Sequence, residues 1–359
     1  MKKLIFKALG ITLLLLSPVI GWFVYDYQLY LTQAVSLDKQ RIDFEILPGT
    51  SLRKLVQELS AKKVISRPHY FQWHARLNHP SLKIYSGEYS LPPGGSPRDL
   101  LKMLASGKVK TYSLTLVEGW TFKQVVEAVR NHSGLKKELV ERLPQDIMKK
   151  LGLPGIDPEG RFYPDTYHFP KHTTDVEFLK RAYKAMQTKL NAEWEKRPAD
   201  TIIKTPYEAL ILASVVERET AVAAERGKIA GVFVRRLKIG MRLQSDPTVI
   251  YGMGDKYNGN ITRADLRRDT PHNTYTRSGL PVTPIAMPSA KAIEAVLNPE
   301  PGKALYFVAR GDGSHEFSDN LKQHNQAVIK YQLKGKTKSF SSYRHVPEST
   351  SNSNNKTKP

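Results

Sequence analysis

A continuous apolar segment occupies the start of the chain. The stretch from Leu4 to Tyr25 is apolar except for Lys7 and the helix-weakening pair Ser17-Pro18. A lysine near the end of such a segment can extend its ammonium group to the membrane interface, so the segment is long enough to cross a bilayer. We predict a transmembrane helix over residues 8–27. The lysines that begin the chain place residues 1–7 in the cytoplasm.

A cleaved signal peptide is the alternative interpretation of this segment. No small-residue cleavage site follows the apolar core. Aromatic residues resembling an interfacial belt are present instead: Trp22, Tyr25, Tyr27 and Tyr30. These features favour a retained anchor in the inner membrane, with the rest of the chain in the periplasm.

A pattern of strand, glycine turn and helix occurs three times in the first half of the chain. The three copies, at residues 46–59, 91–104 and 116–129, align without gaps. In each copy a Ser or Thr follows the glycine, and apolar residues then recur at helical spacing. The pattern predicts three helix N-caps, at Ser51, Ser96 and Thr121.

A small module is predicted around the first two copies. A further helix should begin at Ser66-Arg67-Pro68, and residues 85–89 are typical of a strand. We therefore expect a compact βααβ unit over residues 41–110. Its aromatic side chains, Tyr70 and Trp73 among them, could stack on sugar rings, but packing in the core is the use that we favour.

The rest of the chain predicts a larger α+β domain, residues 111–332, followed by a polar tail. Residues 333–359 are rich in Ser, Asn and Lys and should be disordered. The most apolar helix of the domain should start at Thr205-Pro206, where an N-cap threonine precedes a proline. Because residues 209–216 are apolar apart from Ser214, this helix should lie at the centre of the domain.

Composition narrows the possible functions. The chain has 359 residues, a formal net charge of +21 and no cysteine. Disulfides and thiolate metal sites are therefore excluded, and the histidines lack ligand spacing, so we expect no metal and no other cofactor. Outside the membrane, a basic chain attracts anionic envelope polymers and lipid headgroups. Only the charge suggests nucleic-acid binding, and the predicted topology argues against it.

Two glutamates close the apolar helix. Glu217 and Glu219 are two positions apart, which separates them by about 200° around a helix. At most one can face a pocket, while its sibling points toward solvent or into an ion pair. A carboxyl group at the end of an apolar helix, with polar side chains of residues 244–248 and 272–275 nearby, is suited to cleaving glycosidic bonds. Ordinary surface charge is the alternative.

Several separated motifs together resemble the endolytic murein transglycosylase (YceG-like) family. They are Phe162-Tyr-Pro-Asp-Thr-Tyr167, Ala213-Ser-Val-Val-Glu-Arg-Glu-Thr220, Arg242-Leu-Gln-Ser-Asp-Pro-Thr-Val-Ile-Tyr-Gly252, Asn273-Thr-Tyr275 and Gly279-Leu-Pro281. The likeness covers nearly the whole exported region. It implies one membrane anchor and a LysM-like module that precedes the catalytic domain.

The resemblance implies that Glu219 is the catalytic residue. In this family a peptidoglycan strand is cut at the MurNAc-GlcNAc β-1,4 bond without water, which leaves a 1,6-anhydro-MurNAc end and, on a nascent strand, terminates elongation. Because the C6 hydroxyl of the sugar is the nucleophile, one carboxyl group serves first as acid and then as base. Burial at the helix end is expected to raise the pKa of Glu219.

Six further residues are candidates for binding the substrate. Five match the polar motifs of the family: Gln244, Asp246, Thr248, Asn273 and Tyr275. Asp246, which precedes a proline, is also typical of a helix cap. Tyr163 is a stacking candidate. With Tyr167 it could form either the wall of a groove or a hydrophobic cluster beneath its loop.

The predicted partners follow from this function and topology. They are the glycan strands of peptidoglycan and the inner membrane, with peptidoglycan synthases (penicillin-binding proteins) as further candidates and no nucleic acid. The alternative function is a non-catalytic peptidoglycan-binding scaffold of the cell-wall synthesis machinery.

Overall fold

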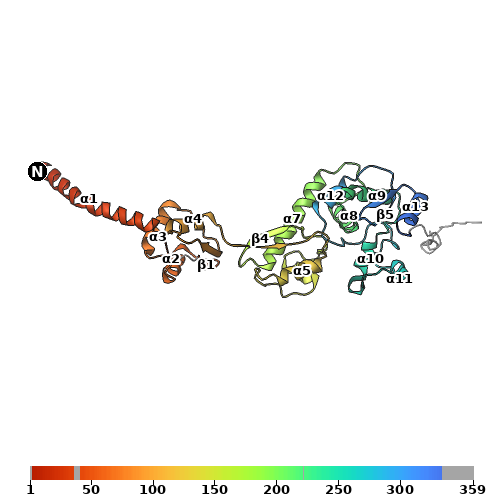
Figure 1. Cartoon of the computed structure of the whole chain (residues 1–359), viewed down its shortest axis with the longest axis horizontal. Coiled ribbons are helices and arrows are strands. Elements are labelled where there is room, and N and C mark those ends of the chain that lie inside the picture. Colours follow the sequence, from red (N-terminus) through yellow and green to blue (C-terminus); the bar gives the residue numbers. More distant parts are fainter. Residues whose placement is uncertain (1, 36–40, 221, 334–359) are drawn as a thin grey trace, which may run out of the picture. The chain divides into compact units, whose positions relative to one another are not determined.

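A computed structural model describes residues 2–35, 41–220 and 222–333 of the chain (Figure 1). The chain divides into two compact units. The first comprises Met1–Thr115, Glu127–Val140 and Thr166–Phe178, and the second comprises Leu116–Val126, Glu141–Asp165 and Leu179–Pro359. Helices are mixed with small antiparallel sheets, which confirms the α+β class. The predicted boundaries, 41–110 and 111–332, stay a prediction, and the predicted disorder after residue 333 lies outside the described residues.

The first unit begins with helix α1, Lys2–Thr32. Its apolar side chains from Leu14 to Tyr25 are exposed, whereas Tyr30 and Leu31, near its end, are buried in the core of the unit. Among the residues that the structure describes, no helix is both long and apolar enough to cross a membrane. The transmembrane helix over residues 8–27 therefore stays a prediction.

The expected βααβ order follows α1. It consists of β1 Ile42–Ile46, α2 Leu52–Ala61, α3 Pro68–Asn78 and β2 Gly87–Leu91, and helix α4, Pro97–Ser106, comes next. Strands β1 and β2 pair antiparallel with Phe44 opposite Tyr89, and the two rings stack 5.5 Å apart. Because period-2 alternation sends these aromatic rings to one face, they pack with apolar residues of the helices in a single core. The likeness of this module to LysM stays a prediction.

The threefold repeat of strand, turn and helix is confirmed. Strands β1, β2 and β3 (Thr111–Thr115) precede helices α2, α4 and α5 (Phe122–Asn131). The glycines of the three turns, Gly49, Gly94 and Gly119, have φ angles of 77°, 74° and 77°, a left-handed backbone that favours glycine.

The side chains expected to cap the three helices do so. Ser51 accepts from the backbone N–H of Lys54, and Ser96 forms a capping box with Asp99. Thr121 Oγ1 accepts from Gln124 N at 3.4 Å. Each cap satisfies a backbone donor that the helix itself leaves unpaired.

A second small sheet completes the first unit. Strand β3 pairs antiparallel with β4, Thr166–Pro170. Tyr167 of β4 is buried, and its ring lies edge-on against Phe178 at 5.3 Å. Of the two interpretations open for Tyr167, the hydrophobic cluster is therefore correct.

The second unit is mainly helical. Helix α7, Asp175–Glu195, continues into it from the first unit, and β5 and β6 form an antiparallel hairpin. The remaining elements are α6 Pro144–Lys150, α8 Pro206–Glu219, η1 Ala223–Glu225, α9 Arg226–Lys238, α10 Asp246–Met253, η2 Gly254–Lys256, α11 Arg263–Arg267, α12 Ala290–Leu297, β5 Tyr306–Ala309, β6 His315–Ser318 and α13 Leu321–Tyr331.

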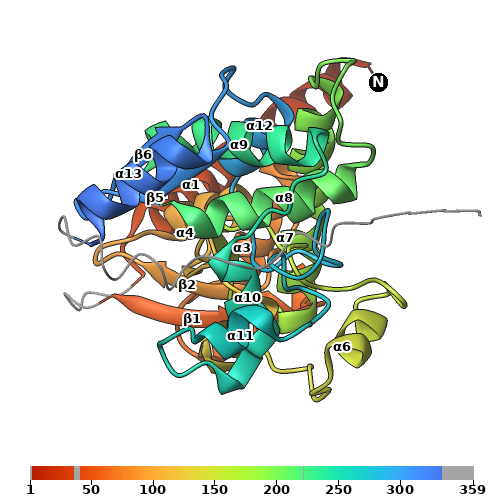
Figure 2. The same cartoon turned by 90° about the vertical axis from the view of Figure 1, so that its right-hand side faces the viewer.

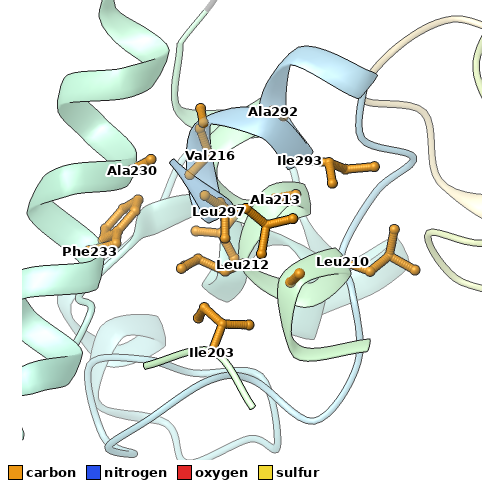
Figure 3. Packing of buried hydrophobic residues seen from close by; sticks show 14 of the residues in the cluster. Ile203, Leu210, Leu212, Ala213, Val216, Ala230, Phe233, Ala292, Ile293 and Leu297 are labelled. Carbon is orange, nitrogen blue, oxygen red and sulfur yellow. The ribbon is translucent and has the colours of Figure 1, made fainter. Parts of the chain in front are cut away.

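Helix α8 is the centre of the second unit, as its apolar sequence predicts. Residues 209–216 are buried on every side, and α8, α9 and α12 lie side by side in both views (Figure 1, Figure 2). Leu212 and Val216 of α8 belong to the same buried cluster as Phe233 of α9 and Leu297 of α12 (Figure 3). Such close packing on all sides holds the end of α8 in a fixed position.

Candidate active site

Glu219 is the last residue of α8. The backbone becomes extended at Thr220, so the helix ends where the carboxyl group of Glu219 leaves the apolar core. The Oγ of Ser245 donates a hydrogen bond to Glu219 Oε1 at 2.5 Å. Glu219, like Glu217, is half-buried as a whole residue. A carboxyl group with a fixed orientation can exchange a proton with a molecule that binds next to it.

The backbone around Ser245 is held by the segment that contains Thr274. Ser245 N donates to Thr274 Oγ1 at 3.0 Å, and Gln244 N donates to Thr274 O at 3.2 Å. Gln244 has a φ angle of 51°, a left-handed conformation that is uncommon for a residue other than glycine. The turn at Gln244 leads into α10, of which Ser245 is the N-cap residue.

The surroundings of Glu219 place its pKa near neutrality. Burial raises the pKa of Glu219 to about 7, and the negative charge of Asp246 acts in the same direction. The hydrogen bond from Ser245 and the positive charge of Arg236 act in the opposite direction. At neutral pH both the protonated and the ionised form are therefore populated, as a residue needs if it is to serve as acid and then as base.

Asp246 and Tyr275 form a hydrogen-bonded pair beside Glu219. Tyr275 Oη donates to Asp246 Oδ1 at 2.5 Å, and Asp246 is exposed. Burial, followed by the charges of Asp246 and Glu219, raises the pKa of Tyr275, so its hydroxyl group stays protonated. Helix α10 begins at Asp246 itself and its N-cap is Ser245, so the helix-cap interpretation of Asp246 is wrong.

Thr248 lies in the interior rather than on the surface of the site. It is fully buried, and its Oγ1 bonds to Ser245 O at 2.6 Å and to Thr274 Oγ1 at 2.9 Å. The hydroxyl group of Thr248 is therefore used to fix the turn that carries Ser245.

Asn273 is buried and supports a neighbouring loop. Its Nδ2 donates to backbone carbonyls at 3.4, 3.1 and 2.8 Å, which belong to Asp265, Leu266 and Arg268. Its Oδ1 accepts from Tyr275 N at 2.8 Å. These contacts use the hydrogen-bonding capacity of the amide, so Asn273 positions Tyr275.

The two remaining candidates differ in exposure. Gln244 is exposed, whereas Tyr163 is partly buried and packs against the core of the second unit. The ammonium group of Lys189 lies 5.7 Å from the centre of the Tyr163 ring. Phe162, its neighbour in sequence, is completely buried. The loop is thus mainly a hydrophobic cluster, with the ring of Tyr163 partly open.

Glu217 faces away from this site. Its side chain is only 5% exposed, and Arg226 Nη2 lies 3.1 Å from its Oε1. Ser289 donates to its Oε2 from both the backbone N–H, at 2.9 Å, and the Oγ, at 2.5 Å. The prediction that one of the two glutamates enters an ion pair is confirmed, and that glutamate is Glu217.

Two residues next to Glu219 are not identified by the sequence reasoning. Ser245 lies within the motif at 242–252 but is not among the six candidates for binding the substrate. Arg236 is buried, with its Nε donating to Leu305 O at 2.7 Å and its Nη1 to Leu243 O at 2.6 Å. Burial lowers the pKa of Arg236. It lies among other basic residues of α9, so no sequence signal distinguishes it.

A second buried carboxyl group belongs to Glu159. Both of its oxygens accept from Phe122 N, at 3.0 and 3.2 Å, and Tyr251 Oη donates to Oε2 at 3.0 Å. Burial raises the pKa of Glu159 to about 7. Since Tyr251 lies on α10, Glu159 ties that helix to the start of α5 within the second unit.

Comparison with known proteins agrees with the geometry. A family model described as "YceG-like family" matches residues 44–330. An endolytic murein transglycosylase of Bacillus subtilis (strain 168) is 30% identical over 331 residues, which cover 87% of this chain and 90% of that protein. An endolytic murein transglycosylase of Streptococcus pneumoniae is 28% identical over 352 residues, which cover 87% of this chain and 62% of that protein.

A solved structure is also similar. The crystal structure of a YceG-like protein from Listeria monocytogenes has a TM-score of 0.52 and 30% sequence identity, and the match covers 80% of this chain and 99% of that one. Both the sequence and the fold of the Listeria protein are thus shared over most of the chain. The chain belongs to the YceG-like family.

Proposed function

We propose that the chain is an endolytic murein transglycosylase that cleaves the glycan strands of peptidoglycan with Glu219 as its acid and base. The observation that carries this proposal is the carboxyl group of Glu219 at the end of a buried helix, with a pKa of about 7 and a hydrogen bond from Ser245. The names of relatives that match 87% of the chain support the same reaction class.

The reaction has two proton transfers. Protonated Glu219 gives its proton to the glycosidic oxygen as the bond from that oxygen to C1 of MurNAc breaks. The C6 hydroxyl of the same MurNAc then attacks C1, and its proton passes to the carboxylate of Glu219, which regenerates the acid. The products are a free hydroxyl on GlcNAc and a 1,6-anhydro-MurNAc end. Ser245 and Arg236 favour the ionised form of Glu219 between the two steps.

The placement of the other acids supports transglycosylation over hydrolysis. Hydrolysis would need a second carboxylate, as nucleophile or as base for a water molecule. Glu217 is paired with Arg226 on another face, and Asp246 already accepts from Tyr275. An internal nucleophile also avoids the entropy cost of capturing water.

The candidates whose polar or aromatic groups are at least partly exposed would contact the substrate. Gln244, Asp246 and Tyr275 lie beside Glu219 in sequence or in space and would hydrogen-bond the sugar, and Tyr163 would stack on a neighbouring ring. Thr248 and Asn273 would act through the residues that they hold in place.

Digestion of purified sacculi by the full chain tests this function. Mass spectrometry of the released muropeptides should show 1,6-anhydro ends, and the Glu219→Gln variant should release none. Reducing ends would indicate a hydrolase that uses Asp246 as its second carboxylate. Sacculi left unchanged by the wild-type protein would favour the non-catalytic scaffold.

Attachment of the chain to the inner membrane through α1 is part of the same proposal. Its support is the exposed apolar surface of α1 between Leu14 and Tyr25 and the lysines that precede it in the sequence. The catalytic unit would then lie in the periplasm, next to nascent strands and their synthases. The protein should fractionate with the inner membrane and keep Met1, whereas a mature N-terminus near residue 25 would contradict this topology.

A tether of this kind would make the enzyme a terminator of strand elongation. It raises the local concentration at the membrane surface without adding a contact. Loss of the gene should lengthen glycan strands, and a form released from the membrane should restore their length poorly. Full restoration by the released form at native expression would show that the tether is dispensable.

A further inference from the structure

Helix α3 presents one face whose side chains are exposed to solvent. His69, Trp73, Arg76 and Leu77 are exposed and follow each other at helical spacing, so they lie along one side of the helix. The opposite side carries Phe71 and Ala75, which are fully buried in the core. Trp73 is 50% exposed and Leu77 is 78% exposed. Large apolar side chains with this exposure on one helix face are typical of an interaction surface.

The sequence segment that contains this face carries only basic charges. Between Ser60 and Gly87 the sequence contains no Asp or Glu. The basic residues of this segment are all exposed: Lys62, Lys63, Arg67, Arg76 and Lys83. Apart from Asp26 of α1, which pairs with Arg67, the charged groups that accompany Trp73 and Leu77 are basic, and this combination complements an anionic lipid surface.

Aromatic contacts fix α3 against α1 in the same unit. The ring of Phe23 on α1 lies 6.3 Å from the ring of Trp73 and 5.6 Å from that of Tyr70. Tyr27 Oη bonds to His74 Nδ1 at 2.7 Å. The exposed aromatic ring of Trp73 is therefore held beside the apolar part of α1.

The contacts of Asp26 mark where the apolar part of α1 ends. Asp26 accepts hydrogen bonds from Arg67 and from Tyr70 Oη. Between Leu14 and Tyr25 the apolar side chains of α1 are exposed, and after Asp26 Tyr30 and Leu31 are buried against the module. The exposed face of α3 thus continues the exposed apolar surface of α1 at the level where a membrane boundary would lie.

We propose that the exposed face of α3 docks on an anionic lipid bilayer. Trp73 and Leu77 would enter the boundary between headgroups and acyl chains, where Trp is favoured, and Arg76 and Lys83 would contact the headgroup phosphates. Docking of α3 adds a second lipid contact to α1 and fixes the orientation of the first unit on the membrane. It is independent of the role proposed for Glu219.

Two other occupants of this face fit the observations less well. A glycan is uncharged along its sugar backbone and would gain little from the basic residues around α3, which contains no carboxylate to accept from sugar hydroxyl groups. A second copy of the chain would bring two surfaces of the same positive sign together, which costs electrostatic free energy.

The four tryptophans of the chain allow a direct test in the full-length protein. Trp22 lies on α1, Trp73 on α3, and Trp120 and Trp194 belong to the second unit. In variants that keep one tryptophan and replace the others by Phe, we reconstitute the protein into phosphatidylglycerol and phosphatidylcholine vesicles with brominated acyl chains. Emission from Trp73 should shift to shorter wavelength and be quenched by the bromine atoms, whereas emission from Trp194 should not change.

Charge variants test the contribution of the headgroups. Arg76→Glu should raise the concentration of phosphatidylglycerol needed for half-maximal quenching of Trp73 by about five-fold or more, because a basic residue loses its attraction to the anionic surface. Lys322→Glu, the same charge change at an exposed position of α13, should have no effect on this concentration. Leu77→Glu should weaken quenching of Trp73 while the emission of Trp22 stays quenched.

Three results would overturn the proposal. Quenching of Trp22 with Trp73 still open to an aqueous quencher would mean that α1 alone contacts lipid. Shielding of Trp73 that grows with protein concentration in the absence of vesicles would assign the face to a second copy of the chain. Shielding by soluble peptidoglycan fragments, but not by vesicles, would assign it to glycan. Circular dichroism of each variant shows whether the module is folded.

Discussion

Glu219 and Glu217 are two positions apart on α8, yet their carboxyl groups have opposite surroundings. Among the residues that the structure describes, the carboxyl group of Glu219 accepts a hydrogen bond at 2.5 Å from Ser245 and has no basic partner. Glu217 is almost completely buried and is held by Ser289 and Arg226. A helical separation of about 200° is the reason, since it turns the two side chains to different neighbours. One carboxyl group is left available for chemistry and the other stabilises the fold.

Substituting the two glutamates should therefore give opposite phenotypes. Glu219→Gln removes the transferable proton and should lower the release of anhydro-muropeptides by about 100-fold or more, with the thermal midpoint of unfolding unchanged. Glu217→Gln leaves the guanidinium of Arg226 without its buried partner and should reduce the free energy of unfolding by about 3 kcal/mol. Below its unfolding temperature the Glu217→Gln variant should keep most of its activity. Equal loss of activity in both variants would contradict the assignment of Glu219.

The pH dependence of activity should move in opposite directions in two neighbouring variants. The proposed reaction starts from protonated Glu219, so kcat/KM should fall as the pH rises through about 7. Ser245→Ala removes a hydrogen bond that favours the ionised carboxylate, so the pKa of Glu219 should rise. The falling limb of the profile of kcat/KM against pH should then move to higher pH. Asp246→Asn removes a repulsive charge and should move both to lower pH.

Gln244→Ala is the matched control for these pH profiles. Gln244 is the exposed neighbour of Ser245 and adds no charge, so its removal should leave the position of the falling limb unchanged. If the falling limb of the pH profile stays at the same pH in both Ser245→Ala and Asp246→Asn, a group other than Glu219 controls the pH dependence of activity.

The stability of the second unit should decrease between pH 4.5 and 7. Burial raises the pKa of Glu159 from 4.5 to about 7, so in this range the folded state binds more protons than the unfolded state. The stabilisation is fully present below pH 4.5 and is lost as the pH rises through 7, at about 3 kcal/mol for this carboxyl group. Urea unfolding followed by Trp194 fluorescence at several pH values should show this slope.

Glu159→Gln should reduce the slope without abolishing it, because the amide does not titrate whereas Glu219, whose pKa is also raised to about 7, still does. Asp255→Asn, at a carboxyl group that is 88% exposed, should leave it unchanged. If Glu159→Gln unfolds with the wild-type dependence on pH, Glu159 does not titrate between pH 4.5 and 7.

Truncation of the Asn273 side chain should reduce the stability of the protein. Asn273→Ala removes the amide that donates to the carbonyls of Leu266 and Arg268 and should lower the free energy of unfolding by about 3 kcal/mol. Asn258→Ala, at an exposed position, should change it by less than about 0.5 kcal/mol. An Asn273→Ala protein with wild-type stability and a strongly raised KM would instead indicate direct contact with the sugar.

The sequence by itself predicts the local elements of this protein. The three repeats, their caps at Ser51, Ser96 and Thr121, and the start of α8 after Thr205 all lie where the pattern places them. The separation of Glu217 from Glu219 also follows from the sequence. Each of these features depends on residues within about one helical turn or one strand. Such short-range features can therefore be predicted from the order of the residues.

Only the tertiary structure decides which polar side chains meet. In the sequence, Thr248 and Asn273 are as plausible as Asp246 and Tyr275 for binding the substrate. In the structure the side chains of Thr248 and Asn273 are buried and hydrogen-bonded within the fold, whereas Asp246 and Tyr275 lie beside Glu219. Likewise, nothing in the order of residues brings Ser245 to Glu219 or Tyr251 to Glu159. These contacts join segments far apart in the chain, and they form because the core fixes the segments in space. The burial that results, which no local pattern encodes, sets the pKa of both carboxyl groups near 7.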